Sequence, residues 1–240
     1  MPTATMTFPA ATKVSKLPVS ARKTPSSKST VATLRSLYPR AARAFLQRDV
    51  TLTYSLLLSA FSNLQPPLSS SLDHLDSHRR KWDILRITLE ATLYTSAPPK
   101  ETLPPSLQSF LLLSPPSLIE IMHSRSLQLF TPASRGKPTP EFLPPQILVA
   151  LVLASVKLDC VHVGRELIDN WLSLRSQSIY EHNQDETQAK EGSDGYEKVV
   201  EMYTLHVLPR LEDWHSAREF LRYETELSQD RRMVRFDNMM

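Results

Sequence analysis

The sequence predicts an all-α fold, arranged as an irregular array of antiparallel helical hairpins of the tetratricopeptide-like kind. Three observations support this prediction. The 240 residues include four glycines and nineteen prolines, whereas hairpin turns between strands and phosphate-binding loops need glycine where φ is positive. Five proline pairs divide the interior into segments, and in these segments apolar residues recur every three or four positions. Alternation with a period of two, which is typical of strands, is nearly absent.

The N-terminus is basic. The first 48 residues contain nine Lys or Arg and no Asp or Glu, and the remainder carries a net charge of −6. Residues 1–30 are rich in Ser, Thr and Pro, so they bury too little apolar surface to offset the entropy lost on ordering. We expect residues 1–30 to form a disordered basic arm and residues 31–240 to form a single helical domain. A mitochondrial presequence is an alternative, although four prolines interrupt the amphipathic helix it requires; a nucleic-acid-binding tail is another.

Prolines also indicate where helices begin, because proline fits the first helical turn while the residue before it disfavours the helical conformation. Helices are expected over residues 39–64 (broken near Asp49), 78–94, 105–113, 116–130, 145–158, 161–180, 196–208 and 214–227. Two long connections remain, residues 131–140 and 182–195. The second is polar and acidic, so we expect a flexible loop that is disordered over residues 184–193. Variable insertion is the favoured explanation for both.

A weak internal repeat places a helix, a tight turn and a second helix around each of Asp49, Asp159 and Asp213. An aspartate at such a turn can cap the following helix. Four residues further on come modest side chains that allow close helix packing, and eight residues further on come leucines: Thr53, Val163 and Ala217, then Leu57, Leu167 and Leu221. Helix pairs stack in this way in tetratricopeptide-like solenoids; a helical bundle with coincidental spacing is the alternative. The expected core positions are Phe61, Leu148, Leu167, Trp171 and Leu221.

Residues that could carry chemistry are few. His74 and His78 have the spacing of metal ligands on one helix face, with Asp73 and Asp76 nearby, but their polar setting favours an ordinary helix start. Cys160 is expected to be a buried, inert thiol, and His206 and His215 have no nucleophile beside them. Motifs of hydrolases, zinc proteases and P-loop proteins are absent. We therefore assign no catalytic, cofactor-binding or metal-binding residue and do not expect an enzyme.

The longest apolar run, residues 147–156, is about half the ~20 residues needed to cross a bilayer. It is expected to be a buried core helix. A secretory apolar region is also missing, so the chain as given is expected to be intracellular and soluble.

The region from Leu143 onward carries a family resemblance. Leu143-Pro144-Pro145 opens an apolar helix starting at Ile147-Leu148, a second helix contains Trp171-Leu172, and an acidic loop follows. The order continues with Tyr196, Val199-Val200-Glu201-Met202-Tyr203, Val207-Leu208-Pro209, Trp214 and Ala217-Arg218-Glu219-Phe220. This order resembles the peroxin twenty-six family, tail-anchored peroxisomal membrane proteins that dock the AAA ATPase pair (peroxin six with peroxin one) driving import-receptor recycling. The hairpin around Asp49 and the Trp82 helix fall where that family has its first helices, so the resemblance covers roughly residues 38–228.

The resemblance implies a non-catalytic adaptor in peroxisome biogenesis, with the AAA ATPase pair as its partner and the cytosolic face of the peroxisomal membrane as its location. The family also has a C-terminal membrane span, which these 240 residues lack. Either a span is missing from this chain through truncation or splicing, or the membrane role is lost and the location is the cytosol. A scaffold subunit of another trafficking, chaperone or mitochondrial complex is the alternative function. The net negative charge beyond residue 48 favours a partner with a basic patch over nucleic acid, and residues 39–94 are the expected contact region.

Overall fold

The computed structural model describes residues 27–69, 73–99, 102–181 and 189–227, and within these ranges all regular structure is helical. The predicted all-α class is confirmed. Residues 1–26 of the expected basic arm and 182–188 of the expected flexible loop lie outside the described residues. The α-helices are α1 (Ser27–Leu46), α2 (Val50–Phe61), α3 (Asp76–Thr95), α4 (Pro105–Phe110), α5 (Pro115–Phe130), α6 (Pro145–Lys157), α7 (Val161–Glu181), α8 (Ala189–Glu201), α9 (Leu208–Arg210) and α10 (Trp214–Tyr223).

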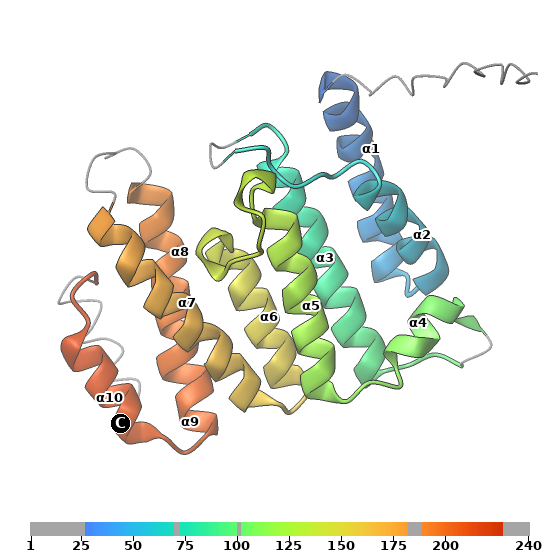
Figure 1. The fold of residues 1–240 in the computed structure, drawn as a ribbon. Helices are drawn as coiled ribbons and strands as arrows, with labels where there is room; N and C mark the ends of the chain where they lie inside the picture. The colour runs from blue at the N-terminus through green and yellow to red at the C-terminus, as the bar shows by residue number, and fades with distance from the viewer. Residues whose placement is uncertain (1–26, 70–72, 100–101, 182–188, 228–240) are drawn as a thin grey trace, which may run out of the picture.

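Helix α6 is the centre of the fold. In Figure 1 the helices lie side by side, with α1 and α2 at one end, α7 to α10 at the other and α6 between them. Helix α6 packs against α3, α5, α7 and α8. Its side chains Ile147, Leu148, Leu151 and Val152 are fully buried, so the apolar run is a core helix as predicted. Among the described residues, no helix has both the length and the apolar character needed to cross a membrane.

Proline marks three of the helix starts within one residue of the predicted positions. Helices α4, α5 and α6 begin at Pro105, Pro115 and Pro145, where the missing N–H of proline has no intrahelical partner to lose. Helix α5 also has a side-chain cap, because the Ser114 hydroxyl accepts a hydrogen bond from the Ser117 N–H at 3.4 Å. The sequence therefore locates these starts through backbone chemistry alone.

Helix α1 begins earlier than predicted. We expected a helix from residue 39 and disorder up to about residue 30, but α1 runs from Ser27 and contains Pro39 in its interior. Its first half is held by packing, since Thr30 and Leu34 are buried. An interior proline removes one helical hydrogen bond, and here burial of Leu34 outweighs that loss.

Helix α8 begins inside the connection that we expected to be a flexible loop over residues 182–195. It starts at Ala189 rather than near Tyr196. Gly195 lies within this helix and in close contact with α6, because a Cβ at this position would lie 2.8 Å from Cγ of Pro145 at the start of α6. Glycine here serves close packing of α8 on α6 instead of a turn.

A π-helical segment, η4 (Met202–Val207), joins α8 to α9. Pro209 follows it closely and has no N–H to continue the regular hydrogen-bond ladder. The wider turn lets the Leu208 N–H donate to the Tyr203 carbonyl, five residues earlier. The predicted helix over residues 196–208 is thus one continuous helical rod with a local change of pitch.

The three predicted turns share one backbone geometry, but in a different register from the one expected. The residue with positive φ is Arg48, Asp159 or Glu212, each with φ between 56° and 59°. In each turn the next N–H donates to a carbonyl five residues earlier, which is the Schellman arrangement: Asp49 to Ala44, Cys160 to Ser155 and Asp213 to Leu208. Asp49 and Asp213 cap the next helix as predicted, accepting from Leu52 and Ser216 N–H groups. Asp159 does not, because it occupies the positive-φ position one residue before the cap.

The corrected register identifies the residue that allows close packing in each helix pair. Four residues after the cap position stand Thr53, Gly164 and Ala217, all buried, so Gly164 replaces Val163 in the expected series. A Cβ on Gly164 would lie 2.3 Å from the Ser155 Oγ. Helices α6 and α7 therefore approach as closely as glycine allows.

Four of the five predicted core residues are buried: Leu148, Leu167, Trp171 and Leu221. Phe61 is the exception. It is only partly buried, because the guanidinium of Arg86 lies 4.6 Å from its ring centroid and the ring borders a cavity.

Candidate functional site

The His74 and His78 region is a helix start held by ion pairs. Both Asp73 oxygens accept hydrogen bonds from Arg79, at 2.6 and 3.0 Å, and Asp76 pairs with Arg80. These bonds engage the two carboxylates that a metal would need. Within the described ranges, no group of three or more His, Cys, Asp or Glu is placed to hold a metal ion.

The other candidates from the sequence lie on different elements. Cys160 is buried at the α6–α7 turn, and burial, followed by the charge of Asp159, raises the pKa of its thiol. This is the environment of an unreactive cysteine. His206 and His215 are exposed. The fold thus brings none of these residues together into one site.

Two cavities instead lie on the surface formed by α1 to α5. Residues of α2 line both of them, and Leu89 of α3 also borders both. The surface overlaps the region, residues 39–94, that we expected to contact a partner, and extends beyond it onto α4 and α5. The cavities differ in chemistry.

The first cavity, which we call the turn groove, is about 500 Å³ and lies between the α1–α2 turn and the C-terminal end of α3. Its lining is mainly apolar and comprises Phe45, Leu46, Val50, Leu89, Leu93, Ala97 and Pro98, with Arg48, Thr53, Thr92 and Ser96. Leu46 is 80% exposed. An apolar side chain from another molecule would cover this leucine and gain burial energy.

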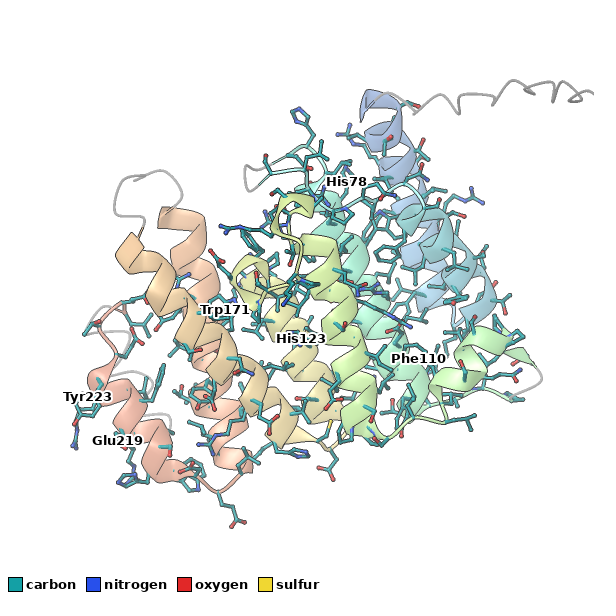
Figure 2. The ribbon with its side chains drawn as sticks, viewed as in Figure 1. His78, Phe110, His123, Trp171, Glu219 and Tyr223 are labelled. Carbon is teal, nitrogen blue, oxygen red and sulfur yellow. The ribbon has the colours of Figure 1, made fainter. Side chains whose placement is uncertain are left out.

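The second cavity, which we call the arginine pocket, is about 390 Å³ and is formed by α2, α3, α4 and α5. Two arginines face it. Arg86 of α3 stacks on Phe61, and Arg125 of α5 stacks on Phe110 at 4.4 Å from guanidinium carbon to ring centroid. Phe110, labelled in Figure 2, is the last residue of α4, and its ring meets Arg125 of α5. Leucines from α2, α3 and α4 complete the walls: Leu57, Leu58, Leu89 and Leu107.

Buried carboxyl groups hold both arginines. Asp83 is fully buried, pairs with Arg86 and accepts a 2.7 Å hydrogen bond from the Ser126 hydroxyl. Burial raises the pKa of Asp83, against the charge of Arg86 and the bond from Ser126. Glu90 is 5% exposed and accepts a 3.0 Å hydrogen bond from Arg125 through Oε1. Burial raises the pKa of Glu90 to about 7, and the charges of Arg86 and Arg125 oppose that rise.

The pocket retains hydrogen-bonding capacity. Glu90 Oε2 and Arg86 Nε are both buried, and neither has a hydrogen-bond partner among the described residues. A buried polar atom without a partner costs free energy, so a ligand that bonded to these atoms after a small movement of the side chains would be stabilised. The pocket can therefore bind a polar group that is surrounded by apolar ones.

The sequence interpretation did not identify this pocket. Its charged residues are 35 or more positions apart between α3 and α5, and their pairing depends on how these helices pack. One signal was present: Asp83 and Glu90 lie on the same side of α3 as buried Ile87, at spacings of four and three residues. Ser126 likewise interrupts the apolar stripe of α5. Acidic and hydroxyl side chains at core positions indicate a buried polar network.

No protein-family model, curated protein or solved structure matches this chain.

Proposed function

We propose that this protein is a non-catalytic adaptor of peroxisome biogenesis that docks the AAA ATPase pair recycling matrix-protein import receptors. The observation that carries the proposal is the position of the two cavities on α1 to α5. Three of these helices, α1 to α3, cover the region where the resemblance to the peroxin twenty-six family places that family's first helices. The proposed location is the cytosolic face of the peroxisomal membrane, or the cytosol.

The architecture supports a binding role. Three helix pairs with the same Schellman turn favour an array of tetratricopeptide-like hairpins, and such arrays present extended surfaces to proteins. Leu46 and Leu58 are 80% and 55% exposed, and they border the turn groove and the arginine pocket respectively. An exposed leucine beside a concave, mainly apolar surface offers area that a protein partner can bury.

Charge is distributed unevenly along the chain, which changes the partner that the sequence favoured. Residues 31–130 contain ten Lys or Arg and seven Asp or Glu, whereas residues 131–240 contain thirteen and eighteen. The half that holds both cavities is therefore net positive by three. It favours an acidic surface on the ATPase, and the basic-patch expectation applies to the C-terminal half.

A binding measurement with the full chain tests the proposal. Leu46→Asp and Leu58→Asp place a charge on the two cavities, whereas Leu153→Asp on α6 is a matched control, because Leu153 is 49% exposed and borders neither cavity. We expect purified peroxin six to bind the wild type and the control, and to bind the two cavity variants at least about tenfold more weakly. Removing α1 to α3 is a poorer test, since α6 would lose its contact with α3.

Two results would contradict the proposal. If the wild-type chain does not bind the ATPase, the peroxisomal assignment is wrong and a scaffold role in another complex becomes the leading function. If all three variants bind as the wild type does, the contact lies outside the α1–α5 surface.

A further inference from the structure

The two guanidinium groups of the arginine pocket keep donors free. Arg86 bonds to Asp83 through Nη2 and Arg125 bonds to Glu90 through Nη1, while each planar group rests on an aromatic ring. Stacking covers one face of a guanidinium but leaves its in-plane N–H groups available. Arg86 Nε is one such donor, buried and without a partner among the described residues.

Glu90 is a second, independent indication of a ligand. It borders the pocket, is 5% exposed, and its Oε2 atom has no partner in the described part of the chain. In its neutral form a carboxyl group donates one hydrogen bond, and in its ionised form it only accepts. The pocket therefore joins a buried carboxyl group with arginine donors on two walls.

We propose that the arginine pocket binds the carboxylate of a glutamate or aspartate in a partner segment whose neighbouring residues are apolar. Arg86 and Arg125 would donate to the carboxylate, and the leucine walls would take the flanking side chains. This proposal rests on the proposed adaptor function and names the chemistry that the partner presents. The net charge of +3 over residues 31–130 makes the pocket complementary to an acidic segment.

A carboxylate suits the pocket better than a phosphate. Asp83 and Glu90 both approach the arginines from within the fold, and a dianion would be repelled by them more strongly than a monoanion. Apolar walls also favour a group that can be carried on an aliphatic stem. A side-chain amide fits the unpartnered atoms but gains no charge attraction from the guanidinium groups.

Glu90 couples this binding to pH. The groups that face it are Asp83 and Arg86 on α3, Arg125 on α5 and the Tyr54 phenol on α2, while α4 contributes only serines as polar groups. Ionised Glu90 competes with an incoming carboxylate for Arg125, whereas neutral Glu90 does not. Because the pKa of Glu90 is about 7, binding should tighten as the pH falls from about 8 to about 6 and should draw a proton onto Glu90.

The test uses two capped tripeptides, acetyl-Leu-Glu-Leu-amide and acetyl-Leu-Gln-Leu-amide, titrated into the full chain and followed by NMR chemical shifts. We expect the glutamate peptide to bind at least about tenfold more tightly than the glutamine peptide. Arg125→Gln should abolish this preference. Arg135→Gln is the matched control, because Arg135 also stacks on an aromatic ring, Phe142, but borders neither cavity.

If Arg125→Gln alone unfolds the protein, a double variant, Glu90→Gln with Arg125→Gln, takes its place, because it removes both partners of the buried pair and leaves no unpaired charge. The double variant should likewise show no preference for the glutamate peptide. Glu90→Gln alone should make binding of the glutamate peptide equally tight at about pH 6 and about pH 8. The proposal is overturned if both peptides bind alike, if neither binds, or if inorganic phosphate displaces the glutamate peptide. Because the peptides contain no part of the ATPase, these results are distinct from failure of the full chain to bind peroxin six.

Discussion

Replacing Gly164 by alanine should weaken the fold even though alanine is the better helix former. An added Cβ would lie 2.3 Å from Ser155 Oγ, 3.4 Å from Ser155 Cβ and 3.5 Å from Val152 Cγ1. The first distance is impossible, so Ser155 must rotate, and it would then lose the 2.8 Å hydrogen bond that its hydroxyl donates to the Val152 carbonyl. Ser155 is fully buried, which leaves the hydroxyl no water to replace that bond.

The magnitude follows from two opposing effects. Alanine in place of glycine in a helix gains about 1 kcal/mol, whereas overpacking of a buried site costs about 1–3 kcal/mol. We expect Gly164→Ala to lower the free energy of unfolding by about 1 kcal/mol, within a range of about 0–2 kcal/mol. In a Ser155→Ala background the nearest contact becomes 3.4 Å, so the same change should be neutral or stabilising by up to about 1 kcal/mol.

Urea unfolding of the wild type, both single variants and the double variant, followed by circular dichroism, measures this difference as a double-mutant cycle. The reasoning is refuted if Gly164→Ala stabilises the wild-type chain, or if its effect is the same with and without the Ser155 hydroxyl. Either result would mean that α6 and α7 separate easily at their turn.

Three further predictions concern stability. Leu167→Ala should cost about 2–5 kcal/mol, because the side chain is buried; a denaturation midpoint unchanged from the wild type would contradict the register of α7. Arg48→Gly should stabilise the α1–α2 turn by about 0.5–1 kcal/mol, because φ is 59° there and glycine adopts positive φ without strain. A melting temperature below that of the wild type would contradict the turn geometry. Burial raises the pKa of Glu90 from 4.5 to about 7, so the folded state keeps a proton that the unfolded chain releases. The resulting stabilisation is complete below about pH 4.5 and is lost as the pH rises through about 7, by about 3 kcal/mol in all. The Glu90→Gln variant should not lose stability over this pH range. If the free energy of unfolding of the two proteins changes in parallel with pH, the raised pKa of Glu90 is excluded as the cause.

Much of the helical order could be predicted because proline acts locally. Pro105 and Pro145 mark helix starts through their own backbone chemistry, without reference to the rest of the fold. Pro39 shows where that rule fails. It lies within α1 because Leu34, five residues earlier, is fully buried, and burial is a property of the assembled fold.

Glycine was misleading for a related reason. Gly195 ends the polar segment that we expected to be a loop, yet it lies in a helix where its missing side chain makes room for Pro145, fifty residues earlier. The arginine pocket is similarly non-local, since Arg125 pairs with Glu90 across 35 residues. From the sequence alone such residues are predicted to be exposed charges, because the sequence does not show which helices become neighbours.

The central position of α6 has a consequence for synthesis of the chain. Helices α3 and α5 precede α6 and can cover part of its surface as soon as it emerges, but α7 and α8, which cover the rest, are completed only at Glu201. The 44 residues between the ends of α6 and α8 take roughly 2–9 s to translate at ordinary rates. During this interval the surface of α6 that α7 and α8 later cover is exposed. Substitutions that delay docking of α7 and α8 should therefore reduce the yield of soluble protein, even where the finished fold is as stable as before.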